Sequence, residues 1–465
     1  MKRHIHLLLL TLLVAPLAFT SCMDDDDEVD YSEGCYISSF SLGSLHRKIY
    51  GTTSEGEDSI YTTTFSGSTF VMSINQRNLT IENLDSLPIR TQLDKVTTSA
   101  VFEGALVWRK ADISNLEDTT WTTYNSSDSL DLTEPIHLRV FSVTGLSSRT
   151  YTLKVNVHQQ RGDSTTWDSL GTVAAMKGMQ ARKTIVWDGK IVVLGQNTED
   201  ALTYIEHPIG TQGEWIARPT TGTTNANIGT IQTQGDHLYM STADGQVIES
   251  TNGIEWTTSA YPALSGLRLV AASEAYLYAL ANGYLYRSNG GEWELETLDD
   301  EASLLPSLQI GSVYYAMKNG RPRLMLIGAR GSDDTKATIW VKSWETGAEE
   351  RTAWMYYTPN QADKYRLPML ESLCVVPYDD GLQALGGKSP DGRYAAMDSI
   401  FHSQDHGITW KAYEDNDMDV DPRLHTVAQG AQHIVATVDE EHFLWVFVDD
   451  QVWRGRINRL GFVRK

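Results

Sequence analysis

The sequence predicts an all-β protein in which a small antiparallel β-sandwich precedes a β-propeller, with six blades expected and seven as the alternative. Three observations lead to this fold class. Residues 31–160 alternate short strand-like stretches with turn residues and contain no convincing helix. Residues 161–465 repeat a short motif that ends in Trp and follows apolar strands. The 13 Trp and 21 Tyr, against 10 Phe, favour strands with half-exposed aromatic edges.

Size and charge limit the possible functions. With 465 residues, 41% of them hydrophobic, the chain can bury more than one core. The formal net charge of −22 repels phosphate backbones and anionic lipid, so we expect no nucleic-acid partner. The sequence contains no phosphate-binding Gly loop, no Cys-x-x-Cys pair and no His-Glu-x-x-His motif. We therefore expect no cofactor and no metal site.

Residues 1–21 are predicted to be a lipoprotein signal peptide. Lys2 and Arg3 precede an apolar run over residues 7–19, which is too short for a stable transmembrane helix. The tetrapeptide Phe-Thr-Ser-Cys that ends at Cys22 resembles the bacterial lipobox. This resemblance implies cleavage before Cys22, acylation of that residue and attachment to a membrane. The alternative is a cleaved signal peptide followed by an incidental cysteine.

Residues 22–30 are predicted to be an acidic tether. A block of Asp and Glu stays solvated and extended, so it separates the folded part from the bilayer. An acidic run directly after a lipidated Cys also resembles the export signal of Bacteroides-type surface lipoproteins. That resemblance implies attachment to the outer membrane at the cell surface, with the periplasmic face as the alternative.

The β-sandwich is expected over residues 31–160. Its clearest strand is 151–158, where Tyr, Leu and Val alternate with polar residues, and the expected hairpin partner is 136–142, reached through a turn at Gly145. About seven strands in this segment are typical of a small antiparallel sandwich. The other expected strands are 35–42, 70–74, 79–82, 95–102 and 105–110.

Three parts of this segment, 75–88, 121–130 and 154–159, together resemble the N-terminal domain of a Bacteroides-type lipoprotein family of unknown function. In that family the domain precedes a propeller. The resemblance therefore implies the same domain order here, and it implies no chemistry.

The β-propeller is expected over residues 161–465. The most complete repeat motif is Ser-Gln-Asp-His-Gly-Ile-Thr-Trp at 403–410, and shorter copies occupy 250–256 and 288–293. Repeats of several strands are typical of propeller blades. Residues 164–170 are predicted to close the ring as the outer strand of the last blade, and seven blades result if Trp167 begins a blade of its own. The six expected blades are 184–219, 227–260, 268–298, 313–359, 372–413 and 426–462.

The 403–410 motif resembles the Asp-box, a turn found in sialidases and other neuraminidase-repeat proteins. We expect Ser403 and Asp405 to bond with the backbone of the turn, Gly407 to supply an unusual backbone conformation, and Trp410 to pack between blades. In that family the turn lies away from the active face. The resemblance therefore indicates a structural role for Asp405, and we expect any ligand site in loops away from this turn.

A non-catalytic binding module is the function that the sequence favours, with loops presented to a glycan or a protein. The candidate ligand-binding residues are Tyr356, Tyr357, Tyr365 and Arg366. They lie in two aromatic-rich loops, and aromatic faces can stack on sugar rings. The alternative for these aromatic residues is packing between blades.

A sialidase-like or other glycoside hydrolase is the alternative function. Sialidases hold a carboxylate with three arginines and use a Tyr–Glu pair and an Asp. Here the early Arg-Ile-Pro motif is missing, and no pattern brings Arg268, Arg323 and Arg366 together. Residues 378–380 are interpreted as a turn before a glycine. We therefore assign no catalytic residue.

The remaining polar motifs are interpreted as structural. His402 and His406 are expected to be solvated, and the acidic stretch 415–421 is expected to be a solvated loop and not a calcium site. Cys35 and Cys374 are expected to be two separately buried thiols, with a bridge between the domains as the alternative.

Overall fold

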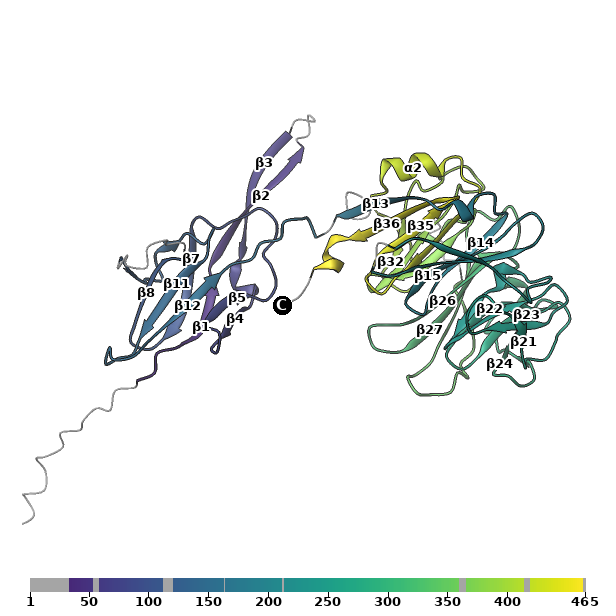
Figure 1. Cartoon of the computed structure of the whole chain (residues 1–465), viewed down its shortest axis with the longest axis horizontal. Coiled ribbons are helices and arrows are strands. Elements are labelled where there is room, and N and C mark those ends of the chain that lie inside the picture. The colour runs from purple at the N-terminus through teal and green to yellow at the C-terminus, as the bar shows by residue number, and fades with distance from the viewer. Residues whose placement is uncertain are drawn as a thin grey trace, which may run out of the picture. The chain divides into compact units, whose positions relative to one another are not determined.

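The computed structural model of the chain describes residues 33–52, 58–111, 120–162, 164–210, 213–358, 365–413 and 419–462. These residues form two compact units, which divide between Gln160 and Arg161 (Figure 1). The predicted signal peptide, Cys22 and the acidic tether lie outside the described residues. Within the described residues, no helix has the length and apolar character needed to cross a membrane.

The first unit is a β-sandwich around one core. One sheet has the strand order β1-β7-β10 and the other β4-β5-β12-β11-β8-β9, and a third group has the order β3-β2-β6. Both main sheets contribute buried side chains to the core, among them Ile37, Val96, Leu138 and Tyr151. The strands are β1 (Ile37–Leu42), β2 (Ser44–Thr52), β3 (Asp58–Ser66), β4 (Met72–Asn75), β5 (Thr80–Asn83), β6 (Thr91–Gln92), β7 (Val96–Phe102), β8 (Ala105–Lys110), β9 (Thr122–Thr123), β10 (Ser129–Leu130), β11 (Ile136–Phe141) and β12 (Ser148–Lys154).

The predicted hairpin is confirmed as β11 and β12, which pair antiparallel from Ile136 opposite Leu153 to Phe141 opposite Ser148. One strand pair of this unit departs from the expected antiparallel arrangement, because β5 and β12 run parallel. β5 and β12 are separated in the chain by β6 to β11, and β12 enters the sheet through its hairpin with β11, so no tight turn forces the β5–β12 pair to be antiparallel.

The β2–β3 hairpin was not expected from the sequence. Its two nine-residue strands pair continuously and project from the rest of the unit in Figure 1. Tyr50 lies opposite Ile60, and both side chains are exposed. Little of this hairpin is buried. Its sequence therefore lacks the alternation of apolar and polar residues that predicts a half-buried strand.

The second unit is a propeller of six four-stranded antiparallel sheets, counted over the described residues. The six predicted blades are confirmed. Because neighbouring strands of a blade alternate in direction, the turns after the first and third strands lie at the same end. Blade one is β14 (Ala181–Trp187), β15 (Lys190–Gln196), β16 (Leu202–Pro208) and β17 (Ile216–Pro219). Blade two is β18 (Gln232–Gln234), β19 (His237–Ser241), β20 (Val247–Ser250) and β21 (Thr257–Thr258). Blade three is β22 (Arg268–Ala272), β23 (Leu277–Ala281), β24 (Tyr284–Ser288) and β25 (Glu294–Leu295).

The other three blades complete the ring. Blade four is β26 (Leu308–Ala316), β27 (Pro322–Ala329), β28 (Thr338–Ser343) and β29 (Met355–Tyr356). Blade five is β30 (Cys374–Tyr378), β31 (Gly381–Leu385), β32 (Phe401–Ser403) and β33 (Lys411–Ala412). Blade six is β34 (Ile434–Val438), β35 (Leu444–Val448), β36 (Gln451–Ile457) and β13 (Thr165–Thr172).

Blade six joins the two ends of the propeller, as predicted. β13 is its outer strand and pairs antiparallel with β36, with Trp167 opposite Gly455. The ring of Trp167 covers that glycine so closely that a Cβ on residue 455 would lie 2.5 Å from it. An ion pair of 3.3 Å between Asp168 and Arg454 adds to the same pairing. The ring is therefore closed by backbone pairing and by one indole.

A short helix, α2 (Pro422–Ala428), precedes β34, and it is the one α-helix among the described residues. This helix was not expected from the sequence. Asp421 caps its first turn by accepting a hydrogen bond from the backbone N–H of Arg423, and Pro422 occupies its first position. Leu424 and Ala428 are buried in the core of blades five and six, so tertiary packing holds this helix in spite of its length.

Both described cysteines are free thiols. Cys35 is buried in the sandwich core, and Cys374 at the start of β30 is half-buried. This agrees with the expectation of two separate thiols.

Candidate functional site

The 403–410 turn connects β32 to β33 in blade five. The Asp405 carboxylate accepts hydrogen bonds from the Ser403 hydroxyl at 2.9 Å and from the backbone N–H and side-chain hydroxyl of Thr409 at 2.8 and 2.7 Å. The Ser403 hydroxyl accepts from the backbone N–H of Gly407 at 2.7 Å. Burial alone raises the pKa of Asp405, but the bonds from Thr409 and Ser403 outweigh it and hold the pKa below its ordinary value.

Gly407 and Trp410 complete this turn. Gly407 has φ of +96°, and a Cβ on it would lie 2.4 Å from the Met325 side chain of blade four. The indole N–H of Trp410 donates to the carbonyl oxygen of Gly407 at 3.0 Å, and the ring is buried with side chains of blades four and five. The turn thus contacts two blades.

The shorter copies repeat these bonds in part. In the 250–256 copy, Asn252 accepts from two backbone N–H groups at 2.9 and 2.8 Å, and Trp256 donates to the carbonyl of Gly253 at 3.1 Å. In the 288–293 copy, Trp293 instead donates to the carbonyl of Pro262. In this shortened copy, where Asn289 directly follows Ser288, the indole bond within the turn is therefore not kept.

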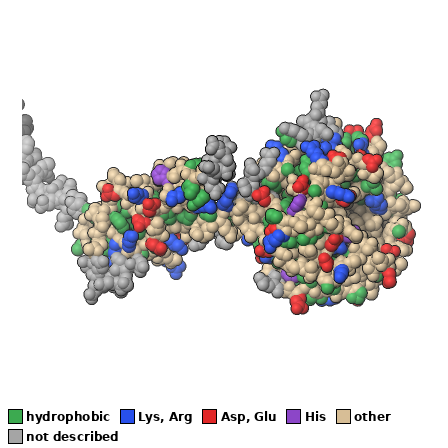
Figure 2. Space-filling model, turned by 90° about the horizontal axis from the view of Figure 1, so that it is seen from above, with side chains coloured by type: hydrophobic (Ala, Val, Ile, Leu, Met, Phe, Trp, Pro, Cys, Tyr) green, Lys and Arg blue, Asp and Glu red, His purple; other side chains and the backbone are tan. Residues whose placement is uncertain are grey.

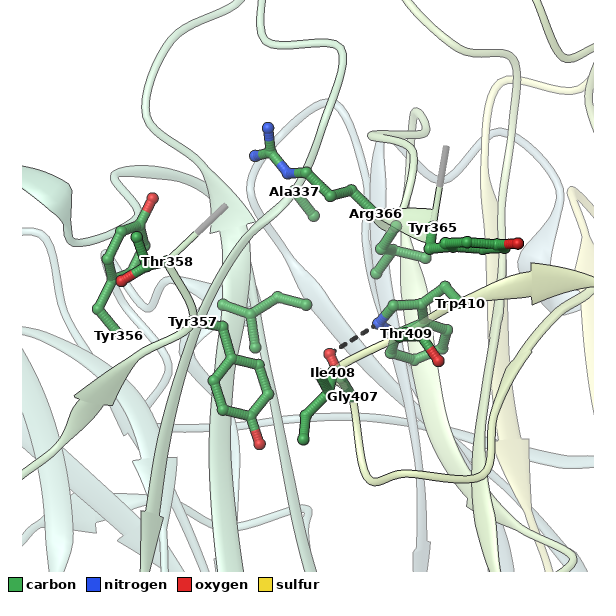
Figure 3. Close-up of a pocket in the computed structure, with 12 residues that line it drawn as sticks. Ala337, Tyr356, Tyr357, Thr358, Tyr365, Arg366, Gly407, Ile408, Thr409 and Trp410 are labelled. Carbon is green, nitrogen blue, oxygen red and sulfur yellow. Dashed lines mark hydrogen bonds between the residues drawn. The ribbon is translucent and has the colours of Figure 1, made fainter. Parts of the chain in front are cut away.

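A pocket of about 220 Å³ lies between blades four and five (Figure 3). Residues at the start of β28, at β29 and just after it form one part of its wall, and the 403–410 turn forms another. All four residues that the sequence analysis singled out as ligand candidates line it. The lining residues are Ala337, Ile339, Tyr356, Tyr357, Thr358, Tyr365, Arg366, Leu367, Gly407, Ile408, Thr409 and Trp410.

The three tyrosines of the pocket are half-buried. Figure 3 shows Tyr356 and Tyr357 on one side and Tyr365 on the other, with the Arg366 side chain extended between them. Tyr356 packs against Trp340, with ring centroids 5.3 Å apart. The tyrosines therefore take part in blade packing and also line the pocket. From the sequence, ligand residues were expected away from the 403–410 turn. In the structure, residues of this turn and the candidate tyrosines line the same pocket.

Arg323 of β27 lies behind Tyr357. One of its Nη atoms donates to the Tyr357 hydroxyl, the other lies 3.4 Å from the Met317 sulfur, and its buried Nε has no hydrogen-bond partner. Among the described residues, this guanidinium makes no ion pair with a carboxylate. Sequence reasoning named Arg323 only in the sialidase comparison, since its neighbours come from three different strands and turns.

The neighbours of Arg323 are neutral groups. Burial raises the pKa of the Tyr357 and Tyr315 hydroxyls, and burial together with Arg323 lowers the pKa of His406. His406 Nδ1 lies 3.1 Å from the Tyr315 hydroxyl. The expectation that His406 is solvated was therefore wrong, because the ring is half-buried beside Tyr315, with ring centroids 5.7 Å apart.

His402 also departs from the expectation of a solvated histidine. Its ring is half-buried and lies 4.2 Å from the Tyr413 ring, centroid to centroid. His402 lies in β32 and Tyr413 directly follows β33, so the pairing of these two strands brings the rings together.

The residues considered for a hydrolase have structural contacts. Asp379 and Asp380 have φ of +51° and +61° and form the two-residue turn between β30 and β31, as predicted for residues 378–380. Asp379 pairs with Arg459, and Asp380 pairs with Lys318 at 3.1 Å. Arg268 belongs to β22 of blade three and does not line the pocket.

The acidic stretch 415–421 is described only from Asp419 onward. The Asp419 carbonyl accepts from the Trp167 indole at 2.8 Å, and Asp421 caps α2. In the described ranges, no group of three or more His, Cys, Asp or Glu side chains has the arrangement of a metal site.

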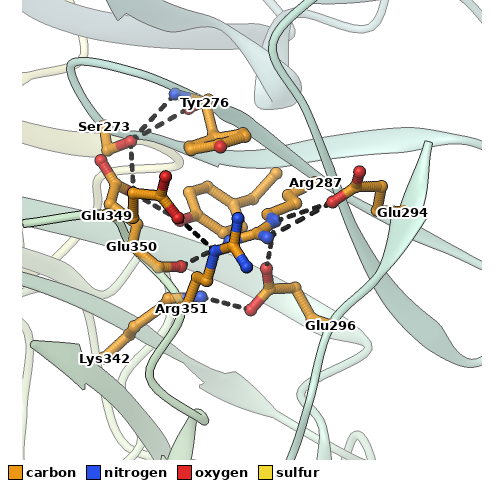
Figure 4. Close-up of polar contacts among 10 residues, drawn as sticks. Ser273, Tyr276, Arg287, Glu294, Glu296, Lys342, Glu349, Glu350 and Arg351 are labelled. Carbon is orange, nitrogen blue, oxygen red and sulfur yellow. Dashed lines mark hydrogen bonds and ion pairs between the residues drawn. The ribbon is translucent and has the colours of Figure 1, made fainter. Parts of the chain in front are cut away.

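A second polar cluster lies between blades three and four (Figure 4). The Lys342 ammonium, almost fully buried, pairs with Glu296 at 2.5 Å, and Arg287 Nε lies 3.2 Å from the other oxygen of Glu296. Glu350 accepts from the hydroxyl of Tyr278 at 2.6 Å. Each buried carboxylate thus has donors from the protein itself, which is typical of a structural network.

Comparison with known families agrees with this two-unit fold. Residues 161–465 match the DUF6242 beta propeller domain, and residues 40–155 match the DUF6242 N-terminal domain, a domain of unknown function. The chain belongs to the DUF6242 family. The order of an N-terminal domain followed by a propeller, implied by the sequence resemblance, is thereby confirmed. No curated protein sequence matches this family member.

Solved structures similar to this DUF6242 chain include propellers of several kinds. YCF48 bound to D1 peptide is 14% identical, with a TM-score of 0.35, and the match covers 63% of this chain and 95% of the YCF48 chain. A mutant of the Aleuria aurantia lectin in complex with alpha-methyl-L-fucoside is 11% identical, with a TM-score of 0.34 and coverage of 60% and 90%. The catalytic domain of a Coprinopsis cinerea GH62 alpha-L-arabinofuranosidase is 15% identical, with a TM-score of 0.29 and coverage of 54% and 96%. At these values the likeness says nothing about ligand or activity.

Proposed function

We propose that this protein is a surface-anchored lipoprotein whose propeller binds a glycan in the pocket between blades four and five. The observation that carries the proposal is that three tyrosines and Arg366 line one pocket. Its volume of about 220 Å³ lies below the range of about 300–1,000 Å³ that is usual for small-molecule sites. A pocket of this size suits one sugar unit of a longer chain better than it suits a protein surface.

The chemistry of the pocket supports sugar binding. Tyrosine rings offer apolar faces to the C–H groups of a sugar and hydroxyls to its polar edge. Arg366 offers several N–H donors, and the Thr358 and Thr409 side chains add hydroxyls at the rim. A ligand that sits between Tyr357 and Tyr365 would therefore meet both kinds of contact.

Binding without hydrolysis is the form of the proposal that we favour. Glycoside hydrolases generally use two carboxyl groups that flank the scissile bond. The described residues that line this pocket include no Asp or Glu, and the Asp405 carboxylate nearby is bonded within its own turn. The hydrogen bonds of the 403–410 turn also support its resemblance to the Asp-box, and with it a structural role for Asp405.

Anchoring through Cys22 rests on the sequence. The lipobox-like tetrapeptide and the acidic run after it support a lipid anchor at the outer membrane, exposed at the cell surface. Replacing Cys22 with Ser is expected to abolish incorporation of labelled fatty acid and release the protein from membranes. Replacing residues 24–28 with Ala is expected to protect the protein from protease added to intact cells, and unchanged cleavage would contradict surface export.

Glycan binding is tested with the full mature chain on a glycan array, followed by titration of the best ligand. Tyr365→Ala is expected to weaken binding about tenfold or more, because a stacking face is lost. Tyr284→Ala is the matched control, since Tyr284 is an exposed tyrosine in blade three, outside the pocket lining. Affinity that survives Tyr365→Ala and Tyr357→Ala would exclude the pocket as the binding site.

A further inference from the structure

The β2–β3 hairpin of the first unit leaves one edge of its sheet open. The strand order is β3-β2-β6, so within the described residues β3 pairs with β2 alone. The segment 60–66 of β3 contains no charged residue, no Pro and no Gly, and its pairing with β2 continues without a bulge. The features that usually protect an edge strand from pairing with another chain are therefore missing here.

The outer part of this hairpin is a ribbon of two strands. β6 pairs with His46 and Arg47, and the carbonyl oxygen of Arg90 accepts from the backbone N–H of Lys48 at 3.3 Å. From Ile49 onward, the part of the chain that the structure describes supplies no third strand. A two-stranded hairpin on its own is at best marginally stable in water. A further strand beside β3 would therefore stabilise this part of the hairpin.

Apolar side chains lie on both faces of the ribbon. Ile49 lies opposite Tyr61 on one face, and Tyr50 lies opposite Ile60 on the other. Tyr50, Tyr61 and Ile60 are 55%, 52% and 61% exposed. The Arg90 guanidinium covers part of Tyr50, at 4.1 Å from its ring centroid. Figure 2 shows apolar side chains of the first unit at its surface. A strand beside β3 would cover part of Ile60 and Tyr61, because directly opposed side chains lie about 5 Å apart.

We propose that β3 is an interface between two copies of this chain, in which the two β3 strands pair antiparallel around Thr62. In this register Thr62 lies opposite Thr62 of the second copy, Tyr61 opposite Thr63, and Ile60 opposite Thr64. The two hairpins then form one four-stranded sheet with a β2 strand on each side. The proposal concerns the first unit and does not depend on glycan binding by the propeller.

A second copy suits this edge because the segment 60–64 complements itself. Aromatic and β-branched side chains opposite each other are favourable, as are Thr–Thr pairs. No charged residue of the segment meets a like charge. Each Lys48 lies opposite Thr62 of its own hairpin, so three strand spacings, about 14 Å, would separate the two ammonium-bearing strand positions. That distance exceeds the screening length of about 8–10 Å at physiological salt. Two-fold dimers that use the same surface on both copies are also the commonest oligomers.

The test uses the full mature chain with Cys22→Ser, which removes the expected lipidation site, in sedimentation experiments up to about 0.5 mM. We expect a reversible dimer with a Kd of about 10–100 µM, because one strand pair is a small interface. A monomer over the whole range would overturn the inference. Species that grow beyond two copies would also overturn it, because a two-fold strand pair closes after two copies.

Charges placed at residue 62 assign the dimer to β3. Thr62→Glu lies opposite Lys48 within its own hairpin, which favours the fold, but it sets two carboxylates opposite each other across the dimer. We expect this variant to weaken the dimer about tenfold or more. Thr62→Lys is expected to weaken it as well, and a mixture of the two variants is expected to restore the dimer. Thr258→Glu, at an exposed Thr in the outer strand of blade two, is the matched control and is expected to have no effect.

Cross-linking locates the two-fold axis. Under mild oxidation, Thr62→Cys is expected to form a disulfide between two copies, whereas Thr258→Cys is not. The Glu and Lys variants are expected to keep the circular dichroism and melting temperature of the wild type, so a mixture that fails to dimerise would overturn the inference. A dimer that keeps its affinity in Thr62→Glu would use another surface and would overturn it too.

Discussion

Asp405 and Thr409 are joined by two hydrogen bonds, one from the backbone N–H of Thr409 at 2.8 Å and one from its hydroxyl at 2.7 Å. The two bonds close the turn between β32 and β33. Asn252 occupies the corresponding place in blade two and accepts from two successive backbone N–H groups through a single oxygen. One acceptor oxygen is therefore sufficient for the backbone part of this turn.

This relationship predicts that Asp405→Asn is mild and Asp405→Ala is not. The amide oxygen of Asn keeps the backbone bond from Thr409, whereas Ala leaves turn donors without an acceptor, at a cost of about 1–3 kcal/mol. We expect Asp405→Asn to lower the free energy of unfolding by less than about 1 kcal/mol. Urea denaturation of both variants checks this. Equal losses in the two variants would mean that the charge of Asp405, and not its acceptor geometry, holds the turn.

Ring closure gives a second prediction, which concerns β13. A chain from Arg161 to Lys465 retains the strand that pairs with β36, and we expect it to fold without the first unit. A chain that begins at Val173 lacks this strand and the Trp167 ring, so it exposes the edge of β36 and is expected to aggregate or to unfold at a much lower temperature. Light scattering and circular dichroism compare the two chains. Equal stability would show that closure does not depend on β13.

Much of the fold was predictable because its signals are local. In blades two and five the turn before the outer strand has a Ser, a Gly and a Trp that contact one another within a few residues, as in Ser403, Gly407 and Trp410. The β11–β12 hairpin is equally local, since alternating burial and a short turn specify it. The six blades followed from counting such units.

The missed features depend on contacts that are distant in the sequence. The β2–β3 hairpin buries little apolar surface, so it lacks the periodicity that predicts a strand. The helix α2 is held by packing of Leu424 against blades five and six and not by its own length. The pocket combines Tyr357 of blade four with Gly407 of blade five, and only the ring arrangement makes these residues neighbours.

The buried network between blades three and four predicts a third outcome. Lys342→Met leaves Glu296 with Arg287 as its remaining ion-pair partner, and we expect a loss of about 3 kcal/mol, because a buried carboxylate that is only partly compensated is costly. Adding Glu296→Gln removes that charge and is expected to recover much of the loss. Chemical denaturation of the single and double variants measures the coupling between these two residues.

A matched surface variant serves as the control for this network. Lys318→Met removes an exposed pair with Asp380 and is expected to cost less than about 1 kcal/mol. A double variant of Lys342 and Glu296 that is less stable than Lys342→Met alone would contradict the role of a partly compensated buried charge.

His406 predicts how the stability of the propeller depends on pH. Burial, with Arg323 and Lys318, lowers its pKa below the ordinary 6.5, although Asp405 opposes the shift. The unfolded chain therefore takes up this proton near pH 6.5, while the folded chain takes it up only at lower pH. Between these two values the unfolded state binds more protons, so the contribution of His406 destabilises the fold as pH falls and disappears well above pH 6.5.

The variant His406→Asn tests this sign, because Asn tolerates a left-handed backbone and does not titrate. We expect the free energy of unfolding to fall less in the variant than in the wild type between about pH 7.5 and pH 5.5. Urea denaturation of the chain from Arg161 to Lys465 at both pH values measures the difference, which isolates His406 from the other histidines because they are common to both proteins. Parallel losses would mean that the His406 ring takes up its proton equally readily in the folded and unfolded chains, and that the contact with Tyr315 does not hold it neutral.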